Sequence, residues 1–103
     1  MVKKITGDEF NEVRNSKLAV VDFSATWCGP CKMLGPVIEQ VSEEMADKAA
    51  FFNVDVDDDQ DIAEEFGIMS IPAVLVFKEG KVVENSVGFR PKEDLIKLIE
   101  GQV

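Results

Sequence analysis

The stretch LAVVDFSATWCGPCK, residues 18–32, decides how this chain folds, and it holds the only two cysteines, Cys28 and Cys31. Residues 18–25 are mostly apolar and favour an extended chain, as a buried strand does. After the cysteines, apolar residues recur at helical spacing as far as Met45. The cysteine pair is therefore expected where a strand ends and a helix begins.

Two thiols separated by two residues can close a small disulfide ring and reopen it, so the pair can store or deliver two electrons. Cys28 is expected at the N-terminus of the helix, where free N–H groups and the helix dipole favour a thiolate over a thiol. Cys31 follows one turn later and is close enough to attack a bond that Cys28 makes. The pattern indicates a redox-active site.

Three other interpretations of the pair stay open from the residues alone. A purely structural disulfide would close only a short loop, which contributes about 2 kcal/mol. A zinc site needs about four ligands, and the chain has no histidine and no third cysteine, so a dimer would be required. Two inert buried thiols are disfavoured because Gly29 and Pro30 favour a surface turn.

Composition sets limits on the class of protein. With 103 residues, 46% of them hydrophobic, the chain is expected to form one domain, residues 1–103, that buries a core without cross-links. Eleven basic against twenty acidic side chains give a net charge of −9, which argues against nucleic acid or an anionic membrane as partners. We expect neither a signal peptide nor a membrane span, and hence a cytoplasmic protein, where structural disulfides are rare.

The chain reads as alternating strands and helices without a linker or an internal repeat. The expected strands are residues 2–5, 18–25, 50–56, 73–77 and 81–87, and the expected helices are 8–15, about 31–45, 59–66 and a last one with Pro91 in its first turn. The spacing of Thr6 and Glu9 predicts a capping box, and Gly67 is expected to end the third helix. Pro36 is expected to kink the second helix.

Strands that alternate with helices predict parallel pairing in the first half of the chain. Residues 78–80, Lys-Glu-Gly, predict a hairpin that adds antiparallel strands at the end. The sequence therefore predicts an α/β domain with one central mixed sheet of about five strands, flanked on both faces by about four helices.

The motif and the order of elements together resemble the thioredoxin family. The matching residues are spread over most of the chain: Val21-Asp22-Phe23, Trp27-Cys28-Gly29-Pro30-Cys31-Lys32, Pro36, Ile71-Pro72 and Gly88. The resemblance implies the thioredoxin fold and a general thiol-disulfide oxidoreductase that reduces protein disulfides. It also implies no bound cofactor, many disulfide-containing protein substrates and a partner reductase, expected to be a flavoprotein that uses NADPH, with ferredoxin as the other electron source. Nothing in the sequence suggests more than a monomer.

The resemblance gives catalytic roles to three residues. Cys28 resembles the attacking thiol and Cys31 the resolving thiol, while Asp22 matches a buried acid that takes the proton of Cys31 directly or through water. Burial would raise the pKa of Asp22, which suits a base needed near neutral pH. A strand acid ordinarily faces water, but the flanking Val21 and Phe23 within this match favour burial.

The resemblance also implies a surface for substrates around the sulfur of Cys28. Six residues are expected to form a flat apolar patch: Trp27, Gly29, Pro30, Ile71, Pro72 and Gly88. Such a patch suits many protein partners. Ile71 and Pro72 match the family's cis-proline loop, whose backbone could pair with an extended substrate segment. Trp27 could instead be an ordinary core aromatic, although it lies next to Cys28 and outside the strand.

The acidic run at residues 55–61 invites a calcium interpretation, which fails. Asp55, Asp57 and Asp59 have the first ligand spacings of an EF-hand, but Gln60 and Phe66 occupy the positions that need glycine and glutamate. A solvated turn at a helix N-terminus accounts for these acids better. No metal site is expected.

Four positions depart from the pattern of many bacterial members of the family. Phe51 stands where many have a lysine near the buried acid, so a raised pKa of Asp22 would rest on desolvation alone. Ser24 replaces a frequent tryptophan, and Met69-Ser70 precede the proline loop in place of other residues. These departures blur the subgroup more than the function.

Two further function classes remain to be separated from a reductase. A disulfide oxidase or isomerase would need an oxidising compartment, and Gly-Pro between the cysteines resembles the reducing members of the family. A binding module would use the apolar patch with the thiols incidental. A disulfide-reduction assay distinguishes them, because a pure binding module has no thiol-dependent turnover.

Overall fold

In the computed structural model, which describes residues 1–103, the strand that leads to the cysteines is the central strand of a five-stranded sheet. The strands are β1 (Val2–Lys4), β2 (Leu18–Ser24), β3 (Ala50–Asp55), β4 (Ala73–Lys78) and β5 (Lys81–Val87). They are ordered β1-β3-β2-β4-β5. β3 is parallel to both β1 and β2, while β4 is antiparallel to β2 and β5. The predicted mixed sheet is confirmed.

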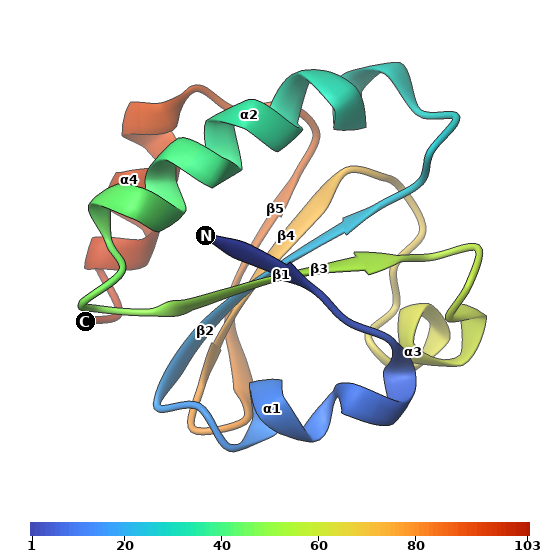
Figure 1. The fold of residues 1–103 in the computed structure, drawn as a ribbon, viewed down its shortest axis with the longest axis horizontal. Helices are drawn as coiled ribbons and strands as arrows, with labels where there is room; N and C mark the ends of the chain where they lie inside the picture. The colour runs from blue at the N-terminus through green and yellow to red at the C-terminus, as the bar shows by residue number, and fades with distance from the viewer.

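The helices cover both faces of this sheet. They are the 3₁₀ turn η1 (Gly7–Glu9) and the α-helices α1 (Asn11–Arg14), α2 (Gly29–Glu44), α3 (Gln60–Glu65) and α4 (Lys92–Glu100). Helices α2 and α4 lie on one face, and α1 and α3 lie on the other (Figure 1). The predicted α/β architecture is therefore confirmed. None of these helices combines the length and the apolar character that crossing a membrane requires.

Several predicted helix boundaries were wrong. The helix predicted over residues 8–15 is a 3₁₀ turn followed by the short α1. Helix α2 begins at Gly29 rather than near Cys31, because Pro30 is well suited to a first turn, whose N–H groups have no partner inside the helix. Pro91 is the N-cap of α4 and lies just outside its first turn. Helix α2 continues through Pro36, and a kink there stays a prediction.

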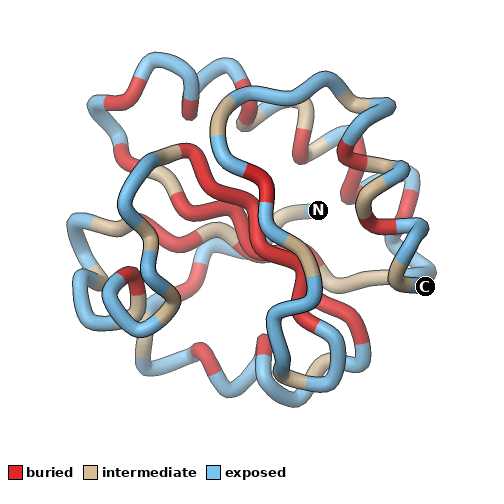
Figure 2. Tube along the Cα trace, turned by 180° about the vertical axis from the view of Figure 1, so that it is seen from behind, coloured by how far each residue is buried: buried red, intermediate tan, exposed pale blue.

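Successive side chains of β2 point to opposite faces of the sheet, so this strand contributes to two cores. Toward α1 and α3 the buried cluster contains Ile5, Phe10, Val13, Ala19, Val21, Phe23, Phe52, Val54, Ala73, Leu75 and Phe77. Toward α2 and α4 it contains Leu18, Val20, Leu34, Ile38, Val41, Met45, Phe51, Val74, Val76, Leu95 and Ile99. Figure 2 shows the buried residues concentrated along the central strands. Asp22 follows Leu18 and Val20 on the face toward α2, at the carboxyl end of β2.

Candidate active site

Cys28 is the N-cap residue of α2, so its side chain lies at the positive end of the helix dipole. Its Sγ accepts a hydrogen bond from the backbone N–H of Cys31 at 3.2 Å. No acidic residue is present in the first turn to oppose a negative charge. Cys28 thus lies at the helix N-terminus, as the sequence predicted, where a donated N–H and the helix dipole would stabilise a thiolate.

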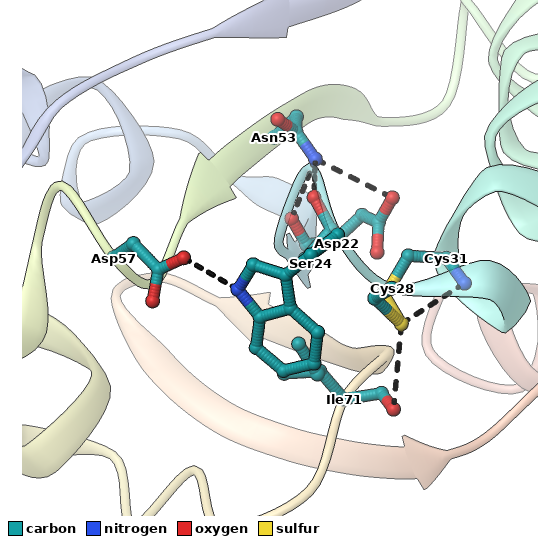
Figure 3. Close-up of a disulfide and its surroundings, with 8 residues drawn as sticks. Asp22, Ser24, Cys28, Cys31, Asn53, Asp57 and Ile71 are labelled. Atoms are coloured by element: carbon teal, nitrogen blue, oxygen red, sulfur yellow. Dashed lines mark hydrogen bonds between the residues drawn. A yellow bond between two sulfur atoms is a disulfide. The ribbon is translucent and has the colours of Figure 1, made fainter.

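Cys28 and Cys31 form a disulfide, with their Cα atoms 5.2 Å apart (Figure 3). Both residues are buried and pack with Ala25, and the partly buried Val56 and Ile71 lie against them. No group of three or more metal-ligating side chains gathers anywhere in the structure. The pair thus has the geometry of a ring that can open and close by thiol-disulfide exchange.

The loop before β4 brings Ile71 and Pro72 beside the disulfide. The peptide bond between them is cis, as the resemblance implied. The carbonyl oxygen of Ile71 lies 4.0 Å from Cys28 Sγ (Figure 3), close enough to accept a weak hydrogen bond from the reduced thiol. The carbonyl of Pro72 accepts a hydrogen bond from the N–H of Gly88 at 2.8 Å. Gly88 has φ +89°, a conformation that suits glycine.

The six residues expected to form the substrate patch differ in exposure. Trp27 is 68% exposed, so the alternative of an ordinary core aromatic was wrong. Its indole N–H donates a hydrogen bond to Asp57 Oδ2 at 2.7 Å (Figure 3). Gly29 and Pro30 are also exposed, whereas Ile71 and Gly88 are half-buried and Pro72 is buried. Pro72 therefore shapes the loop and adds little accessible apolar surface.

Sequence reasoning missed three exposed apolar side chains that lie near these positions in the chain. Met69, which is 95% exposed, precedes the proline loop; Met33 follows Cys31, and Phe89 follows Gly88. The available signal was a large apolar residue in a turn or a first helical turn beside each predicted site position. Exposed methionine is flexible and adapts to varied partners.

Asp22 is only 3% exposed, so its expected burial is confirmed. Loss of hydration raises the pKa of Asp22 from 3.8 to about 6, although a hydrogen bond from Asn53 lowers it. The carboxyl oxygen Oδ1 makes no hydrogen bond. In Figure 3 the side chain of Asp22 points to the side of β2 on which the two cysteines lie. A carboxyl group with this pKa can accept a proton near neutral pH.

Comparison with known proteins agrees with this geometry. Residues 1–101 match the family model described as thioredoxin. A thioredoxin of Bacillus subtilis is 47% identical over 98 residues, which cover 95% of this chain and 94% of that one. A thioredoxin of Listeria monocytogenes is 44% identical over the full length of both chains. The chain belongs to the thioredoxin family.

Solved thioredoxin structures have the same fold. The thioredoxin of Malassezia sympodialis superposes with a TM-score of 0.89 at 40% identity, covering 100% of this chain and 92% of that one. A mutant thioredoxin of Halobacterium salinarum gives a TM-score of 0.87 at 34% identity, covering 96% of this chain and 89% of that one. Members of the thioredoxin family are protein disulfide oxidoreductases, and this chain has the redox-active cysteine pair. The family implies protein disulfides as substrates and a reductase as partner.

The surroundings of Asp22 agree with one expectation about this thioredoxin-family chain and add one residue that the sequence did not suggest. Phe51 is buried in the apolar cluster beneath α2, and no lysine contributes to the pKa of Asp22. Desolvation is the only influence that raises the pKa of Asp22, as expected, and the amide of Asn53 lowers it. Sequence reasoning missed Asn53. It is a polar residue within an apolar strand, but only the register of β2 with β3 places it opposite Asp22.

The acidic run forms a turn and a helix start, as expected. The carboxylate of Asp55 accepts a hydrogen bond from the N–H of Asp57 at 2.8 Å, and Asp59 is the N-cap of α3. The carboxylate of Asp59 also accepts a hydrogen bond from the N–H of Gly7 at 2.8 Å. These contacts account for two of the acids as structural, and Asp57 holds the indole of Trp27.

Proposed function

We propose that this chain reduces protein disulfides with Cys28 as the attacking thiolate, Cys31 as the resolving thiol and Asp22 as the acceptor of the Cys31 proton. The observation that carries the proposal is the position of Cys28 Sγ at the N-cap of α2, where it accepts the Cys31 N–H at 3.2 Å. Of the two sulfurs, the one at the N-cap receives the donated N–H and the field of the helix.

In the first step, the Cys28 thiolate of the reduced protein attacks one sulfur of a substrate disulfide. A bond forms between Cys28 and that sulfur, the substrate S–S bond breaks, and the other substrate sulfur leaves as a thiolate that takes a proton from water. The product is a mixed disulfide between protein and substrate.

In the second step, Cys31 gives its proton to the Asp22 carboxylate and its sulfur attacks Cys28. The Cys28–Cys31 disulfide forms, the bond to the substrate breaks, and the second substrate thiol is released. Two electrons have then passed from the protein to the substrate, and Asp22 returns its proton to solvent. Asp22 suits this role because burial raises its pKa to about 6.

Substrate binding is proposed for the apolar surface around Cys28. Neither polar backbone group of Ile71 makes a backbone hydrogen bond, so both are free to pair with an extended segment of substrate. Trp27, Gly29 and Pro30 would contact the substrate on the other side of the sulfur, with Gly88 completing the patch. The backbone supplies affinity that does not depend on sequence, which suits many different protein substrates.

A partner reductase must return two electrons to the Cys28–Cys31 disulfide after each cycle. We propose an NADPH-dependent flavoprotein for this role, with the chain acting as a monomer in the cytoplasm and holding no cofactor of its own. A reducing compartment keeps the dithiol form available. Turnover with purified NADPH-dependent flavoprotein reductase, compared with turnover driven by reduced ferredoxin, tests the electron source.

Trapping with single cysteine variants tests the assigned roles. Cys28→Ser is expected to abolish reduction of a disulfide-containing test protein and to trap nothing. Cys31→Ser is expected to complete one attack and to accumulate a mixed disulfide, which non-reducing electrophoresis detects as a shifted band. Equal trapping by both variants would contradict the assigned roles. If the wild type showed no thiol-dependent reduction of the test protein, the chain would be a binding module instead.

A further inference from the structure

Asn53 lies on β3 directly opposite Asp22 on β2. Its side-chain nitrogen Nδ2 is within hydrogen-bond distance of three acceptors: Ser24 Oγ at 2.9 Å, the backbone carbonyl of Asp22 at 3.1 Å and Asp22 Oδ2 at 3.5 Å (Figure 3). An amide nitrogen carries two hydrogens. The two shorter bonds therefore hold the amide, and the carboxylate shares one of its hydrogens over the longer distance.

The two anchors of the Asn53 amide do not titrate. The hydroxyl of Ser24 and the backbone of β2 keep the N–H groups in place whether or not Asp22 is charged. A donor that is already oriented favours the charged form of a nearby carboxyl group, because no reorganisation is needed when the charge appears.

No other group on the face toward α2 stabilises the charged form of Asp22. In the sheet, the neighbours of Asp22 are Asn53 on one side and the apolar Val74 on the other. The titratable groups nearest to this region are the two cysteines at the start of α2, Asp55, which lies opposite Ser24, and the exposed Lys4 of β1, which pairs with Asn53. Lys4 makes no contribution to the pKa of Asp22, and the side chain of Asn53 is the only donor that stabilises the Asp22 carboxylate.

We propose that Asn53 is a positioning residue for the second step of the exchange: its amide, fixed by Ser24 and by the backbone of β2, holds the Asp22 carboxylate charged and ready to take the Cys31 proton. This inference rests on the proposed function of Asp22. In that step the proton moves from Cys31 Sγ to the carboxylate, the Cys31–Cys28 bond forms, and the substrate sulfur leaves with the electron pair of its bond to Cys28.

The inference has a direct consequence for the titration of Asp22. Burial raises the pKa of Asp22 to about 6 even though Asn53 opposes the shift. Without the amide the pKa would rise further, so a smaller fraction of the protein would hold a charged Asp22 near neutral pH. Asn53 thus widens the pH range in which the second step can proceed.

Asn53→Leu tests the first part of the inference, since leucine has a similar size and no donor. In oxidised protein with ¹³C-labelled aspartate, the carboxyl signal of Asp22 is expected to titrate roughly 0.5–1 pH unit higher than in the wild type, a moderate effect because the bond is long. Asn85→Leu is the matched control, because Asn85 is exposed on β5 and pairs with Leu75. It should leave the Asp22 signal unchanged.

The rate of substrate release from a preformed mixed disulfide tests the second part. Asn53→Leu is expected to lose about 2- to 5-fold at pH 6, with the loss gone by about pH 8, where Asp22 is charged in both proteins. In an Asp22→Asn background, Asn53→Leu should cause no further pH-dependent change. Asn53→Ala, which only removes atoms, serves if leucine prevents folding.

The two readouts separate the possible failures. An unchanged Asp22 titration in the folded variant would overturn the inference and leave the role of Asp22 intact. A shifted titration with an unchanged pH–rate profile would overturn the role of Asp22 as proton acceptor, and the inference would fall with it. A shift in both, abolished by Asp22→Asn, is the result expected.

Discussion

Asp22 and Phe23 are neighbours in the chain and are almost equally buried, yet they face opposite sides of β2. Phe23 belongs to the apolar cluster beneath α1 and α3, whereas Asp22 lies with Asn53 and Ser24 on the face toward α2. Burial stabilises an aromatic ring and destabilises a charged carboxylate. Both faces carry an apolar cluster that stabilises the fold, but only the face toward α2 also holds a buried carboxyl group, which lowers stability at the end proposed for the chemistry.

The face toward α1 and α3 is centred on three phenylalanines: Phe10 at the N-cap of α1, Phe66 at the C-cap of α3 and Phe77 in β4. The ring of Phe66 lies 5.3 Å from that of Phe10 and 5.1 Å from that of Phe77, and two of the three contacts are edge-to-face. The Arg14 guanidinium lies 5.2 Å from the centre of the Phe10 ring and pairs with Glu65. The cluster joins α1, α3 and the sheet without any residue of the cysteine site.

Phe77→Ala is the substitution with the largest expected effect on stability, and it tests whether the face toward α1 and α3 is independent of the cysteine site. Phe77 is fully buried, so the change should lower the free energy of unfolding by about 3–5 kcal/mol. Urea denaturation measures the loss, and the rate of disulfide reduction per folded molecule should not change. Val82→Ala is the control, because Val82 pairs with Phe77 in the sheet but is exposed. A loss of turnover in folded Phe77→Ala protein would show that the two faces are coupled.

Asp22→Asn should act in the opposite direction. The pKa of Asp22 rises from 3.8 to about 6 on folding, so at neutral pH the charged carboxyl destabilises the native state. About two units at 1.36 kcal/mol each set an upper limit of roughly 3 kcal/mol for the gain in the free energy of unfolding at pH 7. The variant should also slow the release of substrate from the mixed disulfide, because no carboxylate remains to accept the Cys31 proton.

The pH dependence fixes the sign of this effect. The unfolded chain releases the Asp22 proton first, so wild-type stability should fall as the pH rises from about 4 and level off above about 6, relative to Asp22→Asn. Phe77→Ala should run parallel to the wild type over the whole range. Urea denaturation of all three proteins provides the curves. Parallel curves for Asp22→Asn and wild type, or undiminished turnover of that variant, would place the proton acceptor elsewhere.

Much of the difference between the two faces of β2 could be predicted from the sequence. The mostly apolar run of residues 18–25 predicted a buried strand, and the flanking Val21 and Phe23 favoured a buried Asp22. The cysteine motif and the turn residues placed the site at the end of that strand. These are local patterns of propensity and spacing, which a single sequence records directly.

What the sequence could not provide depends on distant segments. Asn53 becomes a partner of Asp22 only through the pairing of β2 with β3, and no local pattern contains that register. The burial of Pro72 likewise depends on how the loops before β4 and after β5 meet, where its carbonyl binds Gly88. The early start of α2 reflects the first-turn preference of Pro30, which the helical spacing of later residues does not include.

The smallest test compares two serines on the face toward α2. Val74 pairs with Asp22 on one side and with Ser86 on the other, so Ser86 lies in the same row across the sheet. Ser86 is buried and its hydroxyl makes no hydrogen bond, whereas the hydroxyl of Ser24 accepts one from Asn53 at 2.9 Å. Replacement by alanine should therefore have opposite effects on the free energy of unfolding at these two positions.

Ser86→Ala removes a buried polar group without a partner and should raise the free energy of unfolding by about 1 kcal/mol. Ser24→Ala removes the acceptor of the Asn53 amide and should lower it by about the same amount. Urea denaturation at one pH measures both, and turnover of Ser86→Ala should match the wild type. Destabilisation by both changes would mean that Ser86 is satisfied in solution. In that case Ser86 would not lower the free energy of unfolding. Among the polar residues at this end of the face (Asp22, Asn53 and Ser24), only the carboxyl group of Asp22 would lower it.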